Sequence, residues 1–435
     1  MDTRPVKIYS KTDVPRLRYI AGILLGDILG LSWELTTDKR KLGKNPVINY
    51  SAESIPGSFK IDPDTLLFES GIVVREIPVN TWKGLPVFFL STTDSDLPFD
   101  IFAASFFLVS RYEEYLEFQP DEFGRFPASS SFSFKNGFLG IPIVDLWVKE
   151  LAKALTRKFQ NIAFKRNEYK ALLTIDTDEP FVYQGKSLVR TIGGLLRDIT
   201  KNEGHVADRY KIFARGDKDP YEVFDYIIQN IEKNNIDVRF FIPVGDHSQY
   251  DKNPSWKNDD YRKLIHKLDS KYITGLHPSF NAAENSLLMN SEKIRLKTIL
   301  EREILISRFH FIRLFTPKTY NDLEKAGIKE DYSMGYPDEP GFRAGIARPY
   351  YFYNVTEERQ TSLKIIPFQI MDATLYKYKN LDPAAAMELV LKLIDETRRV
   401  GGLFVSIWHN TSLLDTQVWH AWRDVFEFML QNQEP

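Results

Sequence analysis

Cysteine is absent from this sequence. The chain therefore has no disulfide and no thiolate metal site, and any transition-metal site must use carboxylates and the seven histidines. A surplus of charge of one sign is also absent, because the formal net charge is −2 at pH 7. This balance argues against a general attraction to nucleic acid or to an anionic membrane, and we predict no nucleic-acid partner.

Long hydrophobic runs are missing as well. The apolar segment 20–31 is interrupted by Asp27 and is too short to cross a bilayer. Its apolar residues recur at helical spacing, which predicts an amphipathic helix of the core. The first residues are polar and lack the hydrophobic region of a secretory signal. We therefore expect no membrane span and a cytoplasmic location.

The 435 residues are enough for two domains with sizeable cores. Residues 1–165 are predicted to form a smaller α/β domain, with helices that begin after Pro98 and near 144. This half contains no histidine, and its sequence assigns it no chemistry. Its run 110–127 mixes charges with aromatic residues, which fits either a recognition surface or a solvated helix face followed by a turn. The strand-like runs of this half are 47–50, 66–68, 72–77 and 86–90.

Residues 166–435 alternate strand-like and helix-like segments, which predicts parallel βαβ units. Polar side chains follow five of the predicted strands directly. Because the carboxyl ends of parallel strands meet at one mouth in β/α barrels, we expect a catalytic or ligand site there. These residues are Asp176 with Asp178, Asp246 with His247, His277, Asp372 and His409.

The segment LLTIDTDEP, residues 172–180, carries the most informative pair. In an extended chain Asp176 and Asp178 project from the same side. Two carboxylates this close raise one pKa unless a cation neutralises them, so a bound metal would resolve the conflict. The structural alternative is an aspartate-rich turn that Pro180 ends.

These residues resemble a known family. The half 166–435 is similar to the polysaccharide deacetylases, the NodB-homology domain of carbohydrate esterase family 4, and LLTIDTD resembles their first motif. The resemblance implies an α/β fold, a distorted (β/α)7 barrel, and removal of N- or O-acetyl groups from polysaccharides with a divalent metal. By the same resemblance Asp176 is the catalytic base and Asp178 is a metal ligand.

The second and third motifs of that family are altered here. His277 matches the first histidine of the second motif, but Asn281 stands where the family has the second histidine. An amide oxygen is a weaker zinc ligand than imidazole. Arg308-Phe-His310 is the best counterpart of the third motif, so His310 is an alternative third ligand. A hydrogen-bonded histidine of the core is the other interpretation of His310.

The last strand ends in His409, which the resemblance makes the general acid, and Asp372 stands where the family has the acid that tunes it. Arg308 would orient the base and keep it ionised. Arg343 lies between two glycines in a predicted loop that could place it at the mouth. Arg343 is therefore predicted to contact the substrate, and Trp408, next to His409, is also predicted to do so.

The sequence thus predicts a metal-dependent hydrolase that removes acetyl groups from a carbohydrate, with Zn²⁺ as the first choice of metal and Co²⁺ or Ni²⁺ as alternatives. Three other functions stay open: an inactive relative that binds carbohydrate, a metal-dependent amidohydrolase of small amides, and a metal-free glycosidase using two of Asp176, Asp178 and Asp372. The missing signal favours an intracellular glycan precursor over a finished wall polymer.

Overall fold

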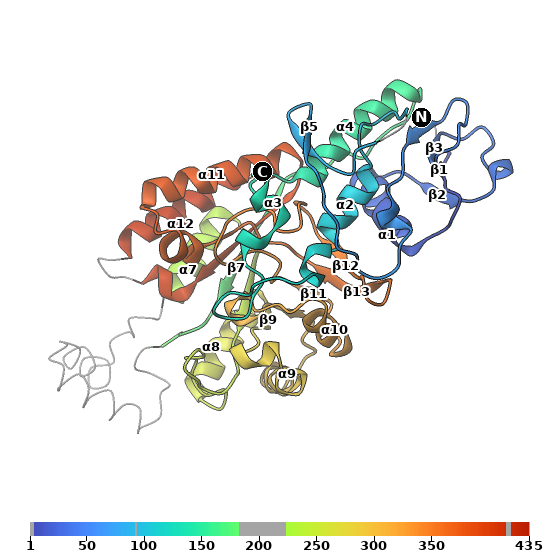
Figure 1. Ribbon diagram of the computed structural model, residues 1–435. Coiled ribbons are helices and arrows are strands. Elements are labelled where there is room, and N and C mark those ends of the chain that lie inside the picture. The colour runs from blue at the N-terminus through green and yellow to red at the C-terminus, as the bar shows by residue number, and fades with distance from the viewer. Residues whose placement is uncertain (1–3, 92–93, 182–222, 415–418, 435) are drawn as a thin grey trace, which may run out of the picture.

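The computed structural model describes residues 4–91, 94–181, 223–414 and 419–434 (Figure 1). The first half contains a parallel sheet of four strands in the order β2-β1-β3-β4, and a short antiparallel pair, β5-β6. The strands are β1 (Val6–Tyr9), β2 (Trp33–Thr36), β3 (Val47–Tyr50), β4 (Phe59–Ile61), β5 (Asn80–Trp82) and β6 (Leu85–Val87). The α-helices are α1 (Pro15–Ala21), α2 (Ile101–Val109), α3 (Phe132–Lys135) and α4 (Ile143–Lys158).

The predicted elements of this half are present only in part. The run 47–50 is β3, and α2 begins after its N-cap Asp100, whose carboxylate accepts hydrogen bonds from the backbone of Phe102 and Ala103. The helix predicted at 20–31 exists as α1 continued by a π-helix, η1 (Gly22–Ile28).

Two predicted strands of the first half are wrong. Residues 66–68 lie in and just after a 3₁₀ turn, η3 (Thr65–Leu67), because Asp64 caps that turn through its side chain. Residues 72–77 lie in neither a helix nor a strand. Ile72, Val73 and Val74 are exposed, Val74 to 80%, and only Ile77 of the apolar residues in this run packs against the core. Apolar composition alone therefore misled the prediction at both places.

The second half is built on a sheet of nine strands in the order β12-β13-β11-β10-β9-β8-β7-β15-β14. All neighbours are parallel except β12 and β13. The strands are β7 (Lys170–Asp176), β8 (Val238–Ile242), β9 (Ile273–Leu276), β10 (Ile306–Ser307), β11 (Glu330–Asp331), β12 (Tyr350–Asn354), β13 (Arg359–Ile365), β14 (Ile370–Met371) and β15 (Leu403–His409). The helices around the sheet are α7 (Phe224–Asn234), α8 (Asp259–Asp269), α9 (Ser286–Leu300), α10 (Lys318–Lys325), α11 (Pro383–Arg399) and α12 (His420–Asn432).

The predicted α/β class is confirmed, but the described strands do not close into a barrel. The ladder of β13 with β11 ends at Ile365, and the ladder of β14 with β15 begins at Ile370. Between them Pro367 has no amide hydrogen to give to a ladder. Gln369 joins this segment to β15 through two hydrogen bonds: its backbone amide donates to the carbonyl of Val405 at 3.0 Å, and its Oε1 accepts a 2.7 Å bond from the amide of Val405. A sheet with two ends therefore curls without forming a continuous ring.

The concave side of this sheet holds a separate apolar cluster. Alternate residues of β7 and β15, among them Leu172, Val405 and Ile407, face this cluster, whereas Leu173 and Trp408 belong to the large core on the helix side. Helices cover the convex side (Figure 1). The carboxyl ends of the strands open at one end of the concave cluster, where the candidate site lies.

The two halves share one core and several buried ion pairs. The large apolar cluster includes residues of both halves. Arg16 bonds to Glu358, and Asp145 accepts a 2.5 Å hydrogen bond from Arg348. The boundary predicted near residue 165 lies between α4 and β7, so the chain crosses from one sheet to the other there.

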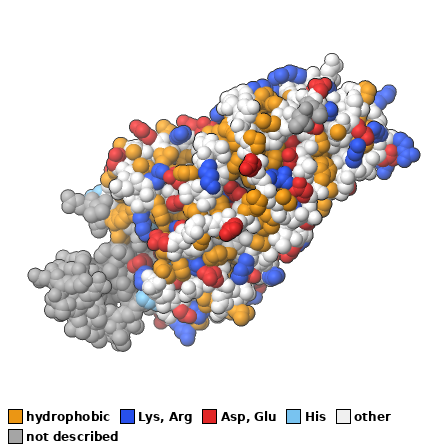
Figure 2. Space-filling model, viewed as in Figure 1, with side chains coloured by type: hydrophobic (Ala, Val, Ile, Leu, Met, Phe, Trp, Pro, Cys, Tyr) orange, Lys and Arg blue, Asp and Glu red, His pale blue; other side chains and the backbone are white. Residues whose placement is uncertain are grey.

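Charges of both signs are interspersed on the face in Figure 2. Within the described ranges, no helix is both long and apolar enough to cross a membrane.

Candidate metal centre

The register of the sheet brings the predicted residues together. His409, the last residue of β15, pairs directly with Asp176, the last residue of β7. Asp176 in turn lies opposite Phe241 of β8, and His277 follows the end of β9 directly. Parallel strands that end at one level therefore deliver a carboxylate and two imidazoles to the same edge.

His277 is held in a single orientation. Its Nδ1 lies 2.7 Å from the carbonyl oxygen of Arg308, which can only accept, so Nδ1 carries the proton of this hydrogen bond. Its Nε2 lies 3.1 Å from Oδ1 of Asp178. Both atoms are buried, and neither has a hydrogen-bond partner among the described residues. Two facing lone-pair donors without a partner form a place for a cation.

His310 approaches the same carboxylate from the other side. Its Nε2 lies 3.3 Å from Oδ2 of Asp178, and its Nδ1 lies 2.9 Å from Oδ1 of Asp251. Asp251 is buried and also accepts a 3.0 Å hydrogen bond from the backbone of Phe280. A carboxylate behind the imidazole is the partner that metal-ligating histidines usually have.

Asp178, His277 and His310 form a compact ligand set, since their ligand atoms lie within 4.8 Å of one another. One carboxylate and two imidazoles are a common set for zinc in sites that keep a position open for water or substrate. Burial would raise the pKa of Asp178, but the His310 and His409 imidazoles outweigh it and hold that pKa well below its usual range. Asp178 is therefore anionic and available as a ligand.

Asp176 and Arg308 form a buried ion pair beneath this cluster. Nη1 of Arg308 donates a 3.0 Å hydrogen bond to Oδ1 of Asp176, and the two side chains are 0% and 2% exposed. The Nε of Arg308 donates to the carbonyl of Tyr332, so the guanidinium is fixed at both ends. The second oxygen of Asp176, Oδ2, faces Nε2 of His277 at 3.9 Å and Nε2 of His409 at 3.8 Å.

His409 is oriented by Asp372. Its Nδ1 lies 2.7 Å from Oδ1 of Asp372, and its backbone amide donates to Oδ2 of the same carboxylate. Burial would lower the pKa of His409, but Asp372, Asp178 and Asp176 raise it to about 9. His409 is therefore protonated at neutral pH and can give up a proton from Nε2.

Residues 6–160 match a family of unknown function, DUF7033. The match covers the first half only and assigns it no activity. No curated protein shows a significant match to the chain.

Solved structures resemble part of the chain at low identity. A protein from Mycobacterium smegmatis described as a polysaccharide deacetylase is 14% identical, with a TM-score of 0.40 over 62% of this chain and 86% of that one. A polysaccharide deacetylase from Bacillus cereus is 10% identical, with a TM-score of 0.32 over 61% and 87%. A pseudoenzyme of carbohydrate esterase family 4 from Bacillus anthracis is 9% identical, with a TM-score of 0.30 over 64% and 66%. Values this low leave the function to be argued from the site itself.

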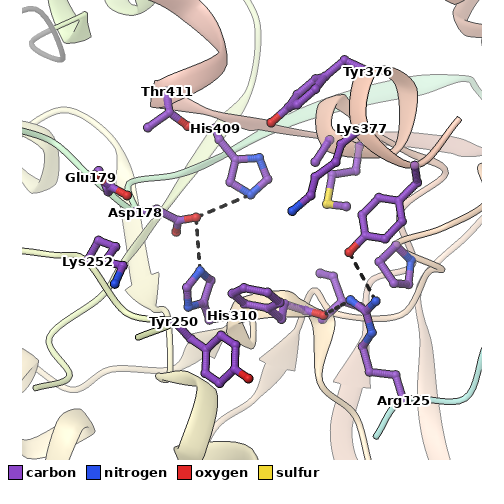
Figure 3. Close-up of a pocket in the computed structure, with 16 residues that line it drawn as sticks. Arg125, Asp178, Glu179, Tyr250, Lys252, His310, Tyr376, Lys377, His409 and Thr411 are labelled. Carbon is purple, nitrogen blue, oxygen red and sulfur yellow. Dashed lines mark hydrogen bonds and ion pairs between the residues drawn. The ribbon is translucent and has the colours of Figure 1, made fainter. Parts of the chain in front are cut away.

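A pocket of about 230 Å³ opens over the carboxylate of Asp178 (Figure 3). His310 and His409 lie on opposite sides of that carboxylate in the picture. Aromatic rings and cationic side chains complete the wall. These are Tyr250, Phe311, Tyr376 and Tyr378, together with Lys252, Lys377 and Arg125.

Arg343 is not at the mouth, contrary to the prediction. It is 2% exposed, its Nε donates a 2.8 Å hydrogen bond to Glu114, and its Nη1 donates to the carbonyl of Gly335. Arg111 bonds to the same Glu114 and to the carbonyl of Arg343. Arg343 therefore ties the second half to the first and does not reach the pocket.

Trp408 is also misplaced by the prediction. It is 1% exposed, its ring packs edge-on against Phe426 of α12, and its Nε1 points to the sulfur of Met429. Because side chains alternate along a strand, the neighbour of an inward-facing His409 must face the helices. Trp408 is a core residue.

Asn281 and Asp246 lie apart from the ligand set. Asn281 is exposed on the 3₁₀ turn η6 (Phe280–Ala283), and Asp246 is exposed and paired with Arg295 of α9. His247 is likewise exposed. Of the two alternatives for the third ligand, the geometry favours His310 over Asn281.

Two residues of the site were not predicted from the sequence. Asp251 follows β8 by nine residues in a loop, and Arg125 comes from the first half, 185 residues before His310. The mixed aromatic and charged run 110–127 was the one hint of Arg125, since it fits a recognition surface as well as a solvated turn.

Proposed function

We propose that this chain is a metal-dependent hydrolase that removes acetyl groups from a carbohydrate. The observation that carries the proposal is the unsatisfied pair formed by Nε2 of His277 and Oδ1 of Asp178, 3.1 Å apart and buried. Both atoms offer lone pairs, and His310 offers a third within 4.8 Å. Asp178, His277 and His310 would hold the ion.

A divalent metal, Zn²⁺ first and Co²⁺ or Ni²⁺ as alternatives, would polarise the acetyl carbonyl and lower the pKa of a water molecule toward ~7. Asp176 accepts the proton of the attacking water through Oδ2, the oxygen that Arg308 leaves free. Arg308 orients this base and balances its charge in the buried site.

His409 completes the reaction as the general acid. The attack of water on the acetyl carbon ends with cleavage of the bond from that carbon to the sugar nitrogen or oxygen. Nε2 of His409 gives its proton to that leaving atom, and acetate is released. Asp372 keeps Nε2 directed at the pocket by holding Nδ1.

The aromatic wall supports a carbohydrate substrate. The faces of Tyr250, Tyr376 and Tyr378 give a sugar ring apolar surface with a polar edge, which suits the two faces of a pyranose. Phe311 adds a further ring. An inactive carbohydrate-binding relative would share this wall but would not need the unsatisfied ligand atoms beneath it.

The test is the metal content of the purified protein, measured by mass spectrometry after loading with Zn²⁺. We expect one ion per chain in the wild type and a loss of that ion in Asp178→Ala, His277→Ala and His310→Ala. Asn281→Ala and His266→Ala are matched controls, because both residues are exposed and outside the ligand set. Both should keep the metal.

Release of acetate from N- and O-acetylated sugars then separates an enzyme from a binding protein. If the wild-type protein stays metal-free under excess Zn²⁺, the metal-dependent deacetylase is ruled out. Full metal without acetate release from any acetylated glycan supports the inactive relative.

A further inference from the structure

A loop of the first half reaches the pocket of the second. Arg125 belongs to the family-matched half, yet it lines the pocket together with Asp178, His310 and His409 (Figure 3). Its side chain is 4% exposed, so it is not a mobile surface group. The function of the first half can therefore be sought in what Arg125 does there.

Arg125 uses every part of its guanidinium. Nε donates a 2.7 Å hydrogen bond to Oδ2 of Asp121 in its own loop. Nη1 donates a 2.7 Å bond to the carbonyl of Phe311, and Nη2 a 3.3 Å bond to the hydroxyl of Tyr378. Asp121 also accepts hydrogen bonds from the backbone amides of Phe123 and Arg125. These bonds lie within the loop, so the loop's own residues fix its conformation independently of its contacts with the second half.

The two partners of Arg125 in the second half both lie beside functional residues. Phe311 follows the metal-ligand candidate His310 directly. Tyr378 ends the π-helix η8 (Thr374–Tyr378), which begins two residues after Asp372, the partner of His409. One guanidinium thus joins the part of the pocket wall that carries His310 to the part that follows Asp372. Short π-helical segments such as η8 are frequent at functional sites.

The turn after His310 has a backbone that needs such support. Phe311 has φ 58° and Ile312 has φ 54°, both in the left-handed region. For a β-branched residue this conformation is an outlier that the surrounding structure must hold in place. Such strain persists where surrounding contacts determine the geometry. The hydrogen bond from Arg125 to the carbonyl of Phe311 is a contact of this kind, because Phe311 is the first residue of the strained pair.

Phe123 of the same loop supports the turn from its other side. Its ring lies 5.0 Å from that of Phe311 and 6.2 Å from those of Tyr250 and Phe280. Its carbonyl accepts a 2.9 Å hydrogen bond from Arg313. Tyr250 directly precedes Asp251 in the chain, and the backbone amide of Phe280 donates a hydrogen bond to that carboxylate, so two members of the cluster adjoin the partner of His310.

We propose that Arg125 is a positioning residue for the metal site, and that the first half supplies a structural part of the catalytic site. Arg125 acts through the His310–Ile312 turn and contacts no ligand atom of the metal. This inference rests on the proposed function, because the quantity that Arg125 affects is the affinity of His310 and its neighbours for the metal ion. It gives the family of unknown function a role in this chain.

The experiment uses the full chain with Arg125→Met, Arg125→Lys and Arg16→Met. Arg16 is the matched control, because it is 1% exposed and joins the halves through Glu358 but lies outside the pocket. The Kd for Zn²⁺ is measured by competition with a chromophoric chelator, and hydrogen exchange is followed in metal-free protein for a peptide that covers residues 306–314.

Arg125→Met should weaken Zn²⁺ binding about tenfold, the lower end of what outer partners of a metal ligand contribute. It should also speed exchange in the peptide 306–314. Arg125→Lys should give a smaller change than Arg125→Met, since an ammonium keeps the charge and can donate to one of the two acceptors, although it cannot span both. It also serves as the test if the methionine variant does not fold. Arg16→Met should leave the Kd and this peptide unchanged, even where it lowers the stability of the protein.

A folded Arg125→Met with the wild-type Kd and wild-type exchange overturns the inference. Equal changes in Arg125→Met and Arg16→Met also overturn it, since they indicate a general loss of contact between the halves. A wild type that binds no Zn²⁺ overturns the proposed function and, with it, the metal-positioning role. Faster hydrogen exchange in metal-free Arg125→Met would then show that Arg125 still holds the His310–Ile312 turn. The proposal that failed would be the metal site, and not the contact between Arg125 and the turn.

Discussion

Replacing Asp251 by asparagine tests the metal centre through a residue that contacts no metal. Oδ1 of Asp251 lies 2.9 Å from Nδ1 of His310 and accepts the backbone amide of Phe280 at 3.0 Å. Asparagine keeps an oxygen at this position, so the substitution removes a charge while it preserves the shape. The variant therefore isolates what the carboxylate contributes to His310 as a ligand.

The magnitude follows from two opposing effects. Loss of an outer partner of a ligating histidine weakens metal binding about 10–100-fold, or about 1.4–2.7 kcal/mol. Burial lowers the pKa of His310, but Asp178 and Asp251 raise it to about 10, so Asp251 also stabilises the proton that competes with the metal. The carboxylate of Asp251 interacts more strongly with a divalent ion bound to His310 than with a single proton on His310, because the ion carries twice the charge. The first effect therefore outweighs the second, and we expect Asp251→Asn to weaken Zn²⁺ binding about tenfold.

The assay is a Zn²⁺ competition titration of wild type and Asp251→Asn between pH 6 and pH 10. In the wild type the affinity should rise by about tenfold per pH unit, because His310 must lose its proton to bind the ion. In the variant the rise should level off at a lower pH, since one of the carboxylates that raises the pKa is gone. Asp145→Asn is the control: Asp145 is also buried and accepts a backbone amide, that of Ala347, but contacts no histidine.

A wild-type Kd and a wild-type pH profile in Asp251→Asn would refute the reasoning, provided that His310→Ala does abolish binding. The carboxylate would then be a packing group and not a partner of the ligand. If Asp145→Asn weakened binding as much as Asp251→Asn, the loss would reflect general destabilisation.

Four further predictions concern the ion pair, the general acid (two of them) and the core. Arg308→Met should lower the free energy of unfolding by about 3–5 kcal/mol, because it leaves Asp176 buried without its partner; a urea-unfolding change below about 1 kcal/mol would contradict this. His409→Gln should keep the metal but lower kcat by about 10²–10⁴-fold. The wild-type kcat should fall as the pH rises through about 9, where the proton donor is lost, and a flat profile from pH 8 to 10 would contradict the assignment. Trp408→Ala should lower the free energy of unfolding by about 3–5 kcal/mol and leave KM unchanged, whereas a raised KM in a stable variant would restore Trp408 to the substrate site.

Strand-end chemistry was the part of the site that the sequence could predict. An apolar run that ends in a polar residue, as at Asp176 and His409, is a local pattern, and parallel pairing brings such ends to one edge. To group Asp178, His277 and His310, one must also know that the loops after β9 and β10, which carry the two histidines, lie close together in space. The sequence left the third ligand open between His310 and Asn281.

Long-range burial was the part that the sequence could not predict. The partner of Arg343 is Glu114, 229 residues earlier, and nothing near either residue indicates the pairing. The misplacement of Trp408 has a different origin, because the alternation of side chains along β15 was available in the sequence and assigns Trp408 to the opposite face from His409. The open sheet depended on Pro367, whose effect was visible only once its neighbours were known.

The buried bonds among Arg111, Glu114 and Arg343 have a practical consequence for anyone who divides this protein. Burial would raise the pKa of Glu114, but Arg343 and Arg111 hold it at about 2, so the carboxylate is charged within the core. A cut near residue 165 would separate Glu114 from Arg343 and leave a guanidinium in the surface that the cut exposes. If an isolated fragment 166–435 were inactive, the cause would be the unpaired charge of Arg343 and the loss of Arg125 from the pocket wall. Such a result would say nothing about the chemistry that the intact chain performs.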